Sequence, residues 1–231
     1  MKSRLLATTT VIAMMTTACT TMEDTEMATI PQTVEYNPTI PQATSIFAEL
    51  SPLYMHAPQF DQIADEEWQG IIEEAITIQL AEVEAIANNP NPPTMDNTLV
   101  AMERSGQVFS RSYGAFSQIV GANINDTIAA TDASLAPQIA GMVDSIYLNA
   151  DLFERVKTIY DNRAAMAMTP EDAMLLEGTY AQFVHRGAEL GAEQQTELRQ
   201  IHERLSSLSS SNSALAMVAP WMPSRPVLDP T

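Results

Sequence analysis

Apolar side chains recur every three or four positions from Phe60 to Asn88, and acidic residues fill much of the remaining surface of that segment. The recurring positions, one of them polar, are Trp68, Ile72, Ile76, Gln79, Val83 and Ile86. This period is that of an amphipathic helix with one buried face. Asp65 is the predicted N-cap of this helix, and the sequence Asn88-Asn89-Pro90 is expected to end it.

The same period returns in later segments, each preceded by a residue that can cap a helix. The expected starts are Thr94 or Asp96, Asn125-Asp126, Asn149, Thr169-Pro170 and about Ala192. Pro137 falls inside the third segment, where we expect a kink or a break because proline cannot donate the helical hydrogen bond. About five or six helices joined by short loops predict an all-α fold, built as an antiparallel multi-helix array.

Two of these helices carry apolar sets with clear helical spacing. The second has Phe109, Tyr113 and Phe116, which we expect in the core rather than in a ligand platform. The last helix has Leu198, Ile201, Leu205 and Leu208. No segment shows the alternation that is typical of a strand, and no internal repeat of fixed period is found.

Residues 1–19 have the layout of a signal peptide. Lys2 and Arg4 provide a positive start, an apolar stretch follows, and Ala18 precedes the single cysteine, Cys19. The segment resembles a bacterial lipoprotein signal, which implies that Cys19 is lipidated and that the protein is exported to the periplasm and anchored to a membrane. The alternative is an ordinary secretory signal in which Cys19 is incidental.

Composition divides the remaining chain into three parts. Residues 20–59 are rich in Thr and Pro and predict an extended tether and entry segment. Residues 60–210 carry the helical pattern. Residues 211–231 form a tail that is rich in proline and unlike what precedes it, and a reading frame error is one explanation for that change. The alternative is a genuine short lipoprotein.

Charge and cysteine content exclude several classes of protein. The chain has 29 acidic and 11 basic residues, a net charge of −18, and no Lys or Arg between Arg4 and Arg104. A nucleic-acid partner needs a basic face, and this chain has none. The same charge argues against direct attraction to anionic membranes, so a lipid anchor is the expected membrane contact. One cysteine excludes an internal disulfide and a cysteine-built zinc site.

The three histidines do not form a recognisable catalytic or metal motif. His202-Glu203 begins like the zinc motif HExxH, but Ser206 stands where the second histidine ligand is needed. His56 and His185 are expected, like His202, to be surface or loop residues. We therefore assign no catalytic, cofactor-binding or metal-binding residue, and Cys19 as a lipidation site is the one functional residue predicted.

Several blocks in order resemble the N-terminal part of bacterial peptidyl-dipeptidases of the thimet-oligopeptidase-like zinc metallopeptidase family. They are Ala57–Ile63, Glu82–Pro90, Pro93–Gly106, Ala122–Thr127, Ile146–Asn149, Leu152–Lys157 and Leu205–Ser210. The resemblance implies a two-lobed helical hydrolase of which this chain is the N-terminal lobe portion. It also implies oligopeptide substrates, and a zinc-dependent release of C-terminal dipeptides at an HExxH helix that this chain lacks.

From the resemblance we expect a chain truncated before the catalytic region, with no cofactor of its own and no peptidase activity alone. Helices that normally pack on a catalytic lobe would then expose apolar faces, so marginal stability and self-association are expected. The alternative function is a non-catalytic, exported helical lipoprotein that binds peptides or interacts with other proteins.

Overall fold

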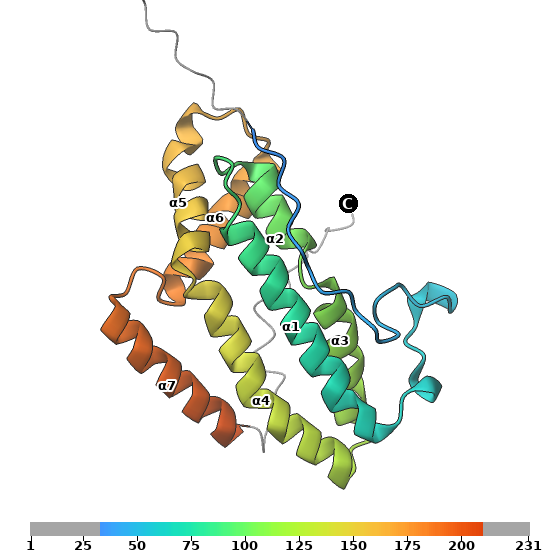
Figure 1. Cartoon of the computed structure of the whole chain (residues 1–231). Helices are drawn as coiled ribbons and strands as arrows, with labels where there is room; N and C mark the ends of the chain where they lie inside the picture. The colour runs from blue at the N-terminus through green and yellow to red at the C-terminus, as the bar shows by residue number, and fades with distance from the viewer. Residues whose placement is uncertain (1–32, 210–231) are drawn as a thin grey trace, which may run out of the picture. The chain divides into compact units, whose positions relative to one another are not determined.

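The computed structural model describes residues 33–209 and is helical through most of this range (Figure 1). Its helices are α1 (Trp68–Ala87), α2 (Ala101–Arg104), α3 (Gln107–Ala122), α4 (Asp126–Tyr147), α5 (Ala150–Asn162), α6 (Pro170–His185) and α7 (Ala192–Ser209). Short 3-10 turns lie at Tyr54–His56, Phe60–Gln62, Asp65–Glu67 and Arg163–Ala165, and a π-helical turn at Met95–Val100. No strand occurs in the described range, and the predicted all-α fold is confirmed. Cys19 and the tail from residue 211 lie outside it.

The helices pack side by side around α1, which lies between α3 and α4 (Figure 1). α7 runs along the outer side of α4, while α5 and α6 pack against each other and α5 also contacts α1. A short loop joins α3 to α4, and these two helices run in opposite directions (Figure 1). α5 continues onward from the end of α4 in roughly the same direction, and α6 then turns back alongside α5.

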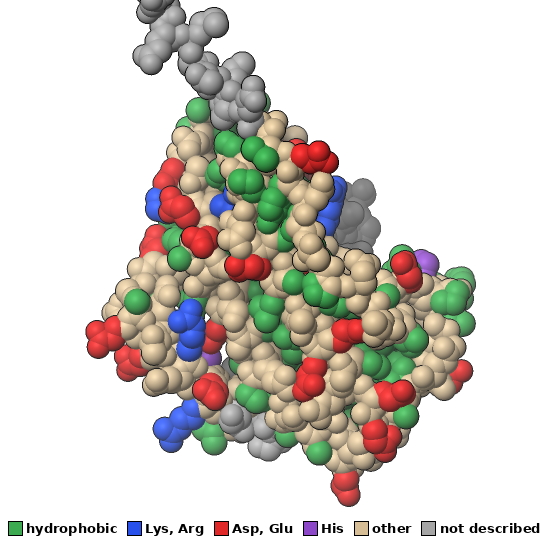
Figure 2. Space-filling model, viewed as in Figure 1, with side chains coloured by type: hydrophobic (Ala, Val, Ile, Leu, Met, Phe, Trp, Pro, Cys, Tyr) green, Lys and Arg blue, Asp and Glu red, His purple; other side chains and the backbone are tan. Residues whose placement is uncertain are grey.

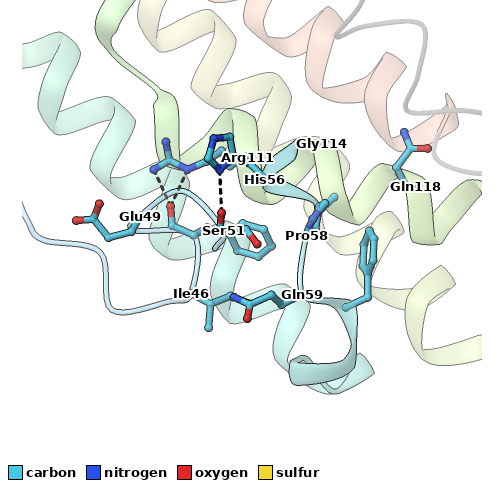
Figure 3. A pocket seen from close by; sticks show the side chains of 12 residues that line it. Ile46, Glu49, Ser51, His56, Pro58, Gln59, Arg111, Gly114 and Gln118 are labelled. Carbon is cyan, nitrogen blue, oxygen red and sulfur yellow. Dashed lines mark hydrogen bonds between the residues drawn. The ribbon is translucent and has the colours of Figure 1, made fainter. Parts of the chain in front are cut away.

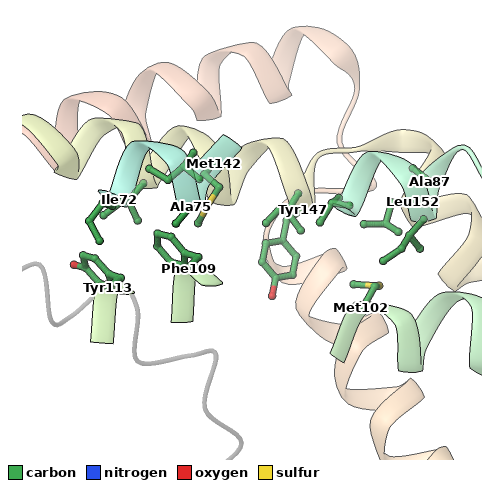
Figure 4. Close-up of a cluster of buried hydrophobic side chains, with 14 of the residues drawn as sticks. Ile72, Ala75, Ala87, Met102, Phe109, Tyr113, Met142, Tyr147 and Leu152 are labelled. Carbon is green, nitrogen blue, oxygen red and sulfur yellow. The ribbon is translucent and has the colours of Figure 1, made fainter. Parts of the chain in front are cut away.

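One hydrophobic core follows α1 along its length (Figure 4). Near the start of α1, Trp68 is 1% exposed and its ring lies 5.6 Å from that of Phe116 and 5.9 Å from that of Phe47. Toward the other end, Leu152 of α5 and Phe183 of α6 are fully buried. The predicted core residues of the second helix, Phe109, Tyr113 and Phe116, are all buried, so that prediction is confirmed.

Most predicted helix starts are correct because they depend on local hydrogen bonds. The side chains of Thr94, Asn125, Asn149 and Thr169 each accept a hydrogen bond from a backbone N–H three residues later. These bonds satisfy N–H groups that have no partner within the helix. The predicted N-cap role of Asp65 is wrong: Asp65 begins a 3-10 turn, and its carboxylate accepts a hydrogen bond from Asn125 at 2.7 Å.

The second predicted helix is not continuous. It is interrupted at Ser105 and Gly106, and Gly106 has a φ of 71°, a left-handed conformation that favours glycine. The backbone N–H of Gly106 donates to Glu82 at 2.6 Å, and a Cβ on Gly106 would lie 2.7 Å from the side chain of Gln79. Gln79, the polar residue in the predicted buried face of α1, therefore lies against Gly106. By contrast, α4 continues through Pro137, so a break there is wrong, while a kink stays a prediction.

The last helix begins at Ala192, as predicted, but of its predicted apolar residues only Leu198 is half-buried, where it lies beside Gly187. Ile201 and Leu205 are each 47% exposed, while Ser206 is 3% exposed. α7 approaches α4 with the face that carries His202 and Ser206. Figure 1 shows α7 at the outer edge of the array.

Candidate functional site

The three histidines lie in separate parts of the structure. His56 is exposed at the end of a 3-10 turn, and His185 is the exposed last residue of α6. His202 lies on α7, where its Nδ1 is 2.7 Å from Oδ1 of Asp144 on α4. His202 lies in a helix rather than in a loop, and its side chain is 28% exposed.

Within residues 33–209, no three His, Cys, Asp or Glu side chains gather closely enough to hold a metal ion. The Asp144–His202 pair lacks a third ligand, and Asp144 is 7% exposed because α7 covers it. This pair joins two helices, α4 and α7. It is best understood as a contact that holds α7 on α4.

A cavity of about 440 Å³ lies where residues 46–60 pass over α3 (Figure 3). These residues, which overlap the end of the predicted tether, are the entry segment of the folded protein. The lining residues of the cavity are Ile46, Phe47, Glu49, Ser51, His56, Pro58, Gln59, Phe60, Arg111, Gly114, Ala115 and Gln118. This volume falls within the range of small-ligand sites, about 300–1,000 Å³, and the mixture of apolar walls and few polar groups is typical of them. The cavity is therefore the candidate functional site.

Arg111 of α3 fixes one wall of the cavity. Its Nε and Nη2 donate to the carbonyl oxygen of Phe47 at 2.9 and 2.7 Å, and Nη2 also donates to that of Ala48 at 2.9 Å. Phe47 is 5% exposed and packs on Trp68. The wall is thus held by polar bonds on one side and by the core on the other.

His56 belongs to a turn with unusual backbone angles. Met55 and His56 have φ of 52° and 56°, a left-handed conformation that is uncommon for residues other than glycine. The Nδ1 atom of His56 lies 2.8 Å from the carbonyl oxygen of Ser51, which can only accept, so Nδ1 carries the hydrogen (Figure 3). In the neutral ring, Nε2 is then left as an acceptor.

Glu74 of α1 secures the chain that leads into the entry segment. Its carboxylate accepts hydrogen bonds from the backbone and hydroxyl of Thr44 at 2.9 and 2.6 Å, and from the backbone of Ser45 at 3.2 Å. Burial raises the pKa of Glu74, but these hydrogen bonds together outweigh burial and the pKa is lowered. The carboxylate form of Glu74 therefore persists and holds the segment at Thr44 and Ser45 against α1.

Sequence patterns missed the cavity. Residues 20–59 were expected to form a tether, yet the described part from Thr33 onward lies against the helices and contributes the buried Phe47. The contacts that hold it join residues far apart in the chain: Arg111 and Phe47 are separated by 64 positions. A run of large apolar residues between Ile46 and Phe60 was the available signal.

A second arginine holds the loop that follows α1. Arg155 of α5 is 7% exposed, and its Nη1 donates to the carbonyl oxygens of Asn89 and Asn91 at 2.7 and 3.1 Å. Its Nη2 donates to Oδ1 of Asn97 at 2.9 Å. Asn91 in turn exchanges two hydrogen bonds with the backbone of Val34. All of these bonds go to oxygen atoms within the helical array, so the role of Arg155 is structural.

Comparison with known proteins finds two related enzymes. The chain is 32% identical over 164 residues to the dipeptidyl carboxypeptidase of Escherichia coli K12, and 31% identical over 168 residues to that of Salmonella typhimurium LT2. The chain is related to the dipeptidyl carboxypeptidases. The resemblance deduced from the sequence blocks is thereby confirmed. A scan against protein-family models finds no match.

The similarity to the dipeptidyl carboxypeptidases covers much of this chain and little of those enzymes. It includes 71% and 73% of this chain but 24% and 25% of the two proteins. The chain thus spans about a quarter of the length of the curated relatives it matches. Among the described residues, no helix is both long enough and apolar enough to cross a membrane.

Proposed function

We propose that this chain is a non-catalytic helical part of a zinc-dependent peptidyl-dipeptidase, an enzyme that hydrolyses oligopeptides and releases their C-terminal dipeptides. The observation that carries the proposal is the identity of 32% over 164 residues to a dipeptidyl carboxypeptidase. Such identity over a long segment predicts the same arrangement of helices. The part played by this segment is to support a catalytic centre formed by other residues.

Zinc has no fitting site in the part of the chain that the structure describes, because no three ligands gather there. The full sequence also lacks an HExxH motif, which supplies two histidine ligands and a general base from one helix face. No catalytic step is therefore assigned to residues of this chain. The chain alone should not release dipeptides.

A peptidase assay of the purified chain tests the last statement. Incubated with a blocked tripeptide or tetrapeptide, with and without added zinc, the chain should release no dipeptide. A chelator-sensitive release of dipeptide would contradict the proposal of a non-catalytic part.

A chimera tests the supporting role. In the Escherichia coli enzyme, the matched segment is replaced by the corresponding residues of this chain, and dipeptide release is measured. The chimera should remain active, whereas the same chimera with Arg155→Ala should lose activity together with thermal stability. A folded chimera without activity would show that the segment does not perform the proposed role.

We also propose that the protein is exported and anchored through a lipid on Cys19, which lies outside the described residues. The support is the sequence layout of residues 1–19. Cells fed a labelled fatty acid should incorporate the label into the wild-type protein and not into Cys19→Ala. Incorporation that is unchanged in the variant would contradict the proposal.

A further inference from the structure

We propose that the cavity between the entry segment and α3 binds the C-terminal end of an apolar peptide, with the peptide carboxylate held by Arg111. Nothing in the similarity to dipeptidyl carboxypeptidases assigns a site to these residues. The proposal rests on unused hydrogen-bonding groups, on the apolar lining and on the backbone of the turn that closes the cavity.

Arg111 has hydrogen-bonding capacity that the described protein does not use. A guanidinium has five N–H donors. Three of them bond to the carbonyl oxygens of Phe47 and Ala48, and the two on Nη1 have no hydrogen-bond partner within residues 33–209. No carboxylate in that range lies within salt-bridge distance of Arg111. A guanidinium without a carboxylate partner can donate its free N–H groups to a ligand carboxylate.

The other polar groups of the lining fit a peptide rather than a simple organic acid. The Nε2 atom of neutral His56 is an acceptor, because Nδ1–H is engaged by Ser51, so Nε2 can receive a peptide N–H. The amides of Gln59 and Gln118 provide both donors and acceptors for further backbone groups. Glu49 also lines the cavity and repels carboxylates, so a ligand carboxylate must lie at Arg111 and away from Glu49.

The apolar part of the lining fits an apolar side chain next to the carboxylate. Ile46 and Phe60 are 38% and 39% exposed although they line a cavity, and Pro58 and Ala115 lie among them. A ligand side chain would cover this surface and remove it from water. Figure 2 shows apolar side chains gathered on this side of the molecule.

The turn at Tyr54–His56 supports the same interpretation. Left-handed backbone at Met55 and His56 costs free energy, and such strain concentrates where a site is held in shape. The side chains of Leu53, Tyr54 and Met55 are exposed, so their packing does not offset the free energy of this strain. The hydrogen bond from His56 to Ser51 instead fixes the ring beside the cavity.

This inference shares the peptide ligand with the proposed function but not its chemistry. Binding is measured without turnover, and the site requires no zinc. A failure of the chimera assay would therefore leave the cavity untested, and a failure of peptide binding would leave the supporting role untouched. The two proposals are distinguishable.

The test is an NMR titration of the full chain with N-acetyl-Leu-Phe, its C-terminal amide, and octanoate. The free acid should bind about tenfold more tightly than the amide, because a charge-assisted hydrogen bond to Arg111 is lost in the amide. Octanoate should bind more weakly than the free-acid peptide. Equal binding of acid and amide, no saturable binding, or octanoate binding as well as the peptide would overturn the proposal.

Two glycines of α3 provide matched variants. A Cβ at Gly114 or at Gly121 meets no atom within 4 Å, so a substitution at either position starts without a clash, and of the two only Gly114 lines the cavity. Gly114→Leu should abolish peptide binding, and Gly121→Leu should bind as wild type. Binding that survives Gly114→Leu would place the ligand elsewhere.

A third variant separates recognition of the carboxylate from general binding. Arg111→Gln should reduce the affinity of the acid to that of the amide, while Arg111→Lys should retain part of the preference. Thermal melting of each variant shows whether the fold is intact. A folded Arg111→Gln that still prefers the acid would contradict the role given to Arg111.

Discussion

Arg111 and Arg155 each hold a non-helical segment against the array, at different ends of α1. The two guanidinium groups differ in their surroundings. Arg155 grips the loop after α1 through the backbone oxygens of Asn89 and Asn91. Arg111 grips the entry segment near the start of α1 through the backbone oxygens of Phe47 and Ala48. Each donates three hydrogen bonds to oxygen atoms, and neither pairs with a carboxylate in the described range.

Burial separates the two arginines. Arg155 is 7% exposed, and burial lowers its pKa while the neighbouring Tyr36 raises it. Arg111 is half-buried, and a cavity reaches it. A guanidinium out of contact with water has a structural role, because its removal leaves the buried oxygen atoms that it bonds without a hydrogen-bond donor. A guanidinium beside a cavity retains donors for a ligand. The two arginines therefore differ in whether a ligand can reach the guanidinium, and not in the number of hydrogen bonds that they donate within the protein.

The largest expected effect tests this distinction through stability. Arg155→Ala should lower the free energy of unfolding by roughly 3 kcal/mol or more, since three hydrogen bonds to a charged donor are lost in a buried position. Arg111→Ala should cost about half as much. Urea unfolding followed by circular dichroism measures both. The control Arg104→Ala, at an exposed position, should change little. Equal losses at the two arginines would remove the proposed difference between them.

A second prediction tests how tightly Gly106 packs against Gln79 of α1. Gly106→Ala should destabilise by roughly 2–3 kcal/mol, because its left-handed φ is costly for alanine and its Cβ would displace the buried Gln79. Gly178→Ala, in the middle of α6 where a Cβ meets no atom, should instead stabilise by about 0.5–1 kcal/mol. A small effect at Gly106 would show that Gln79 can move aside.

A third prediction concerns Tyr113, a buried core residue of α3. Burial, helped by the charge of Asp132, raises the pKa of Tyr113 to about 12. The folded state then holds its proton more firmly than the unfolded state, so stability is full below about pH 10 and falls as pH rises toward 12. The slope should reach about 1.4 kcal/mol per pH unit. Urea unfolding at several alkaline pH values measures it.

Tyr113→Phe is the matched variant for that prediction. It should reduce the alkaline slope without removing it, because burial also raises the pKa of Tyr147. An ultraviolet titration in which Tyr113 ionises near its ordinary pKa would show that water reaches it.

Local features of the fold follow from the sequence, and the site does not. The cap at Thr169 and the buried face of α1 depend on residues within a few positions of one another, so spacing reveals them. The clamp of Arg155 on Asn89 joins residues 66 positions apart, and no periodic pattern encodes it. Helical spacing likewise predicted α7 but not that Ile201 would be exposed, because spacing defines an apolar stripe without saying what covers it.

The smallest expected effect tests the strain in the turn that closes the cavity. Met55→Gly should stabilise the protein by about 0.5 kcal/mol, because glycine adopts a φ of 52° without steric cost but loses more entropy on folding. Met55 is 80% exposed, so few contacts are lost. Met55→Ala keeps the strain and should change little. If Met55→Gly stabilises no more than Met55→Ala, the turn is not strained, and backbone strain does not distinguish the wall beside Arg111 from the surroundings of Arg155.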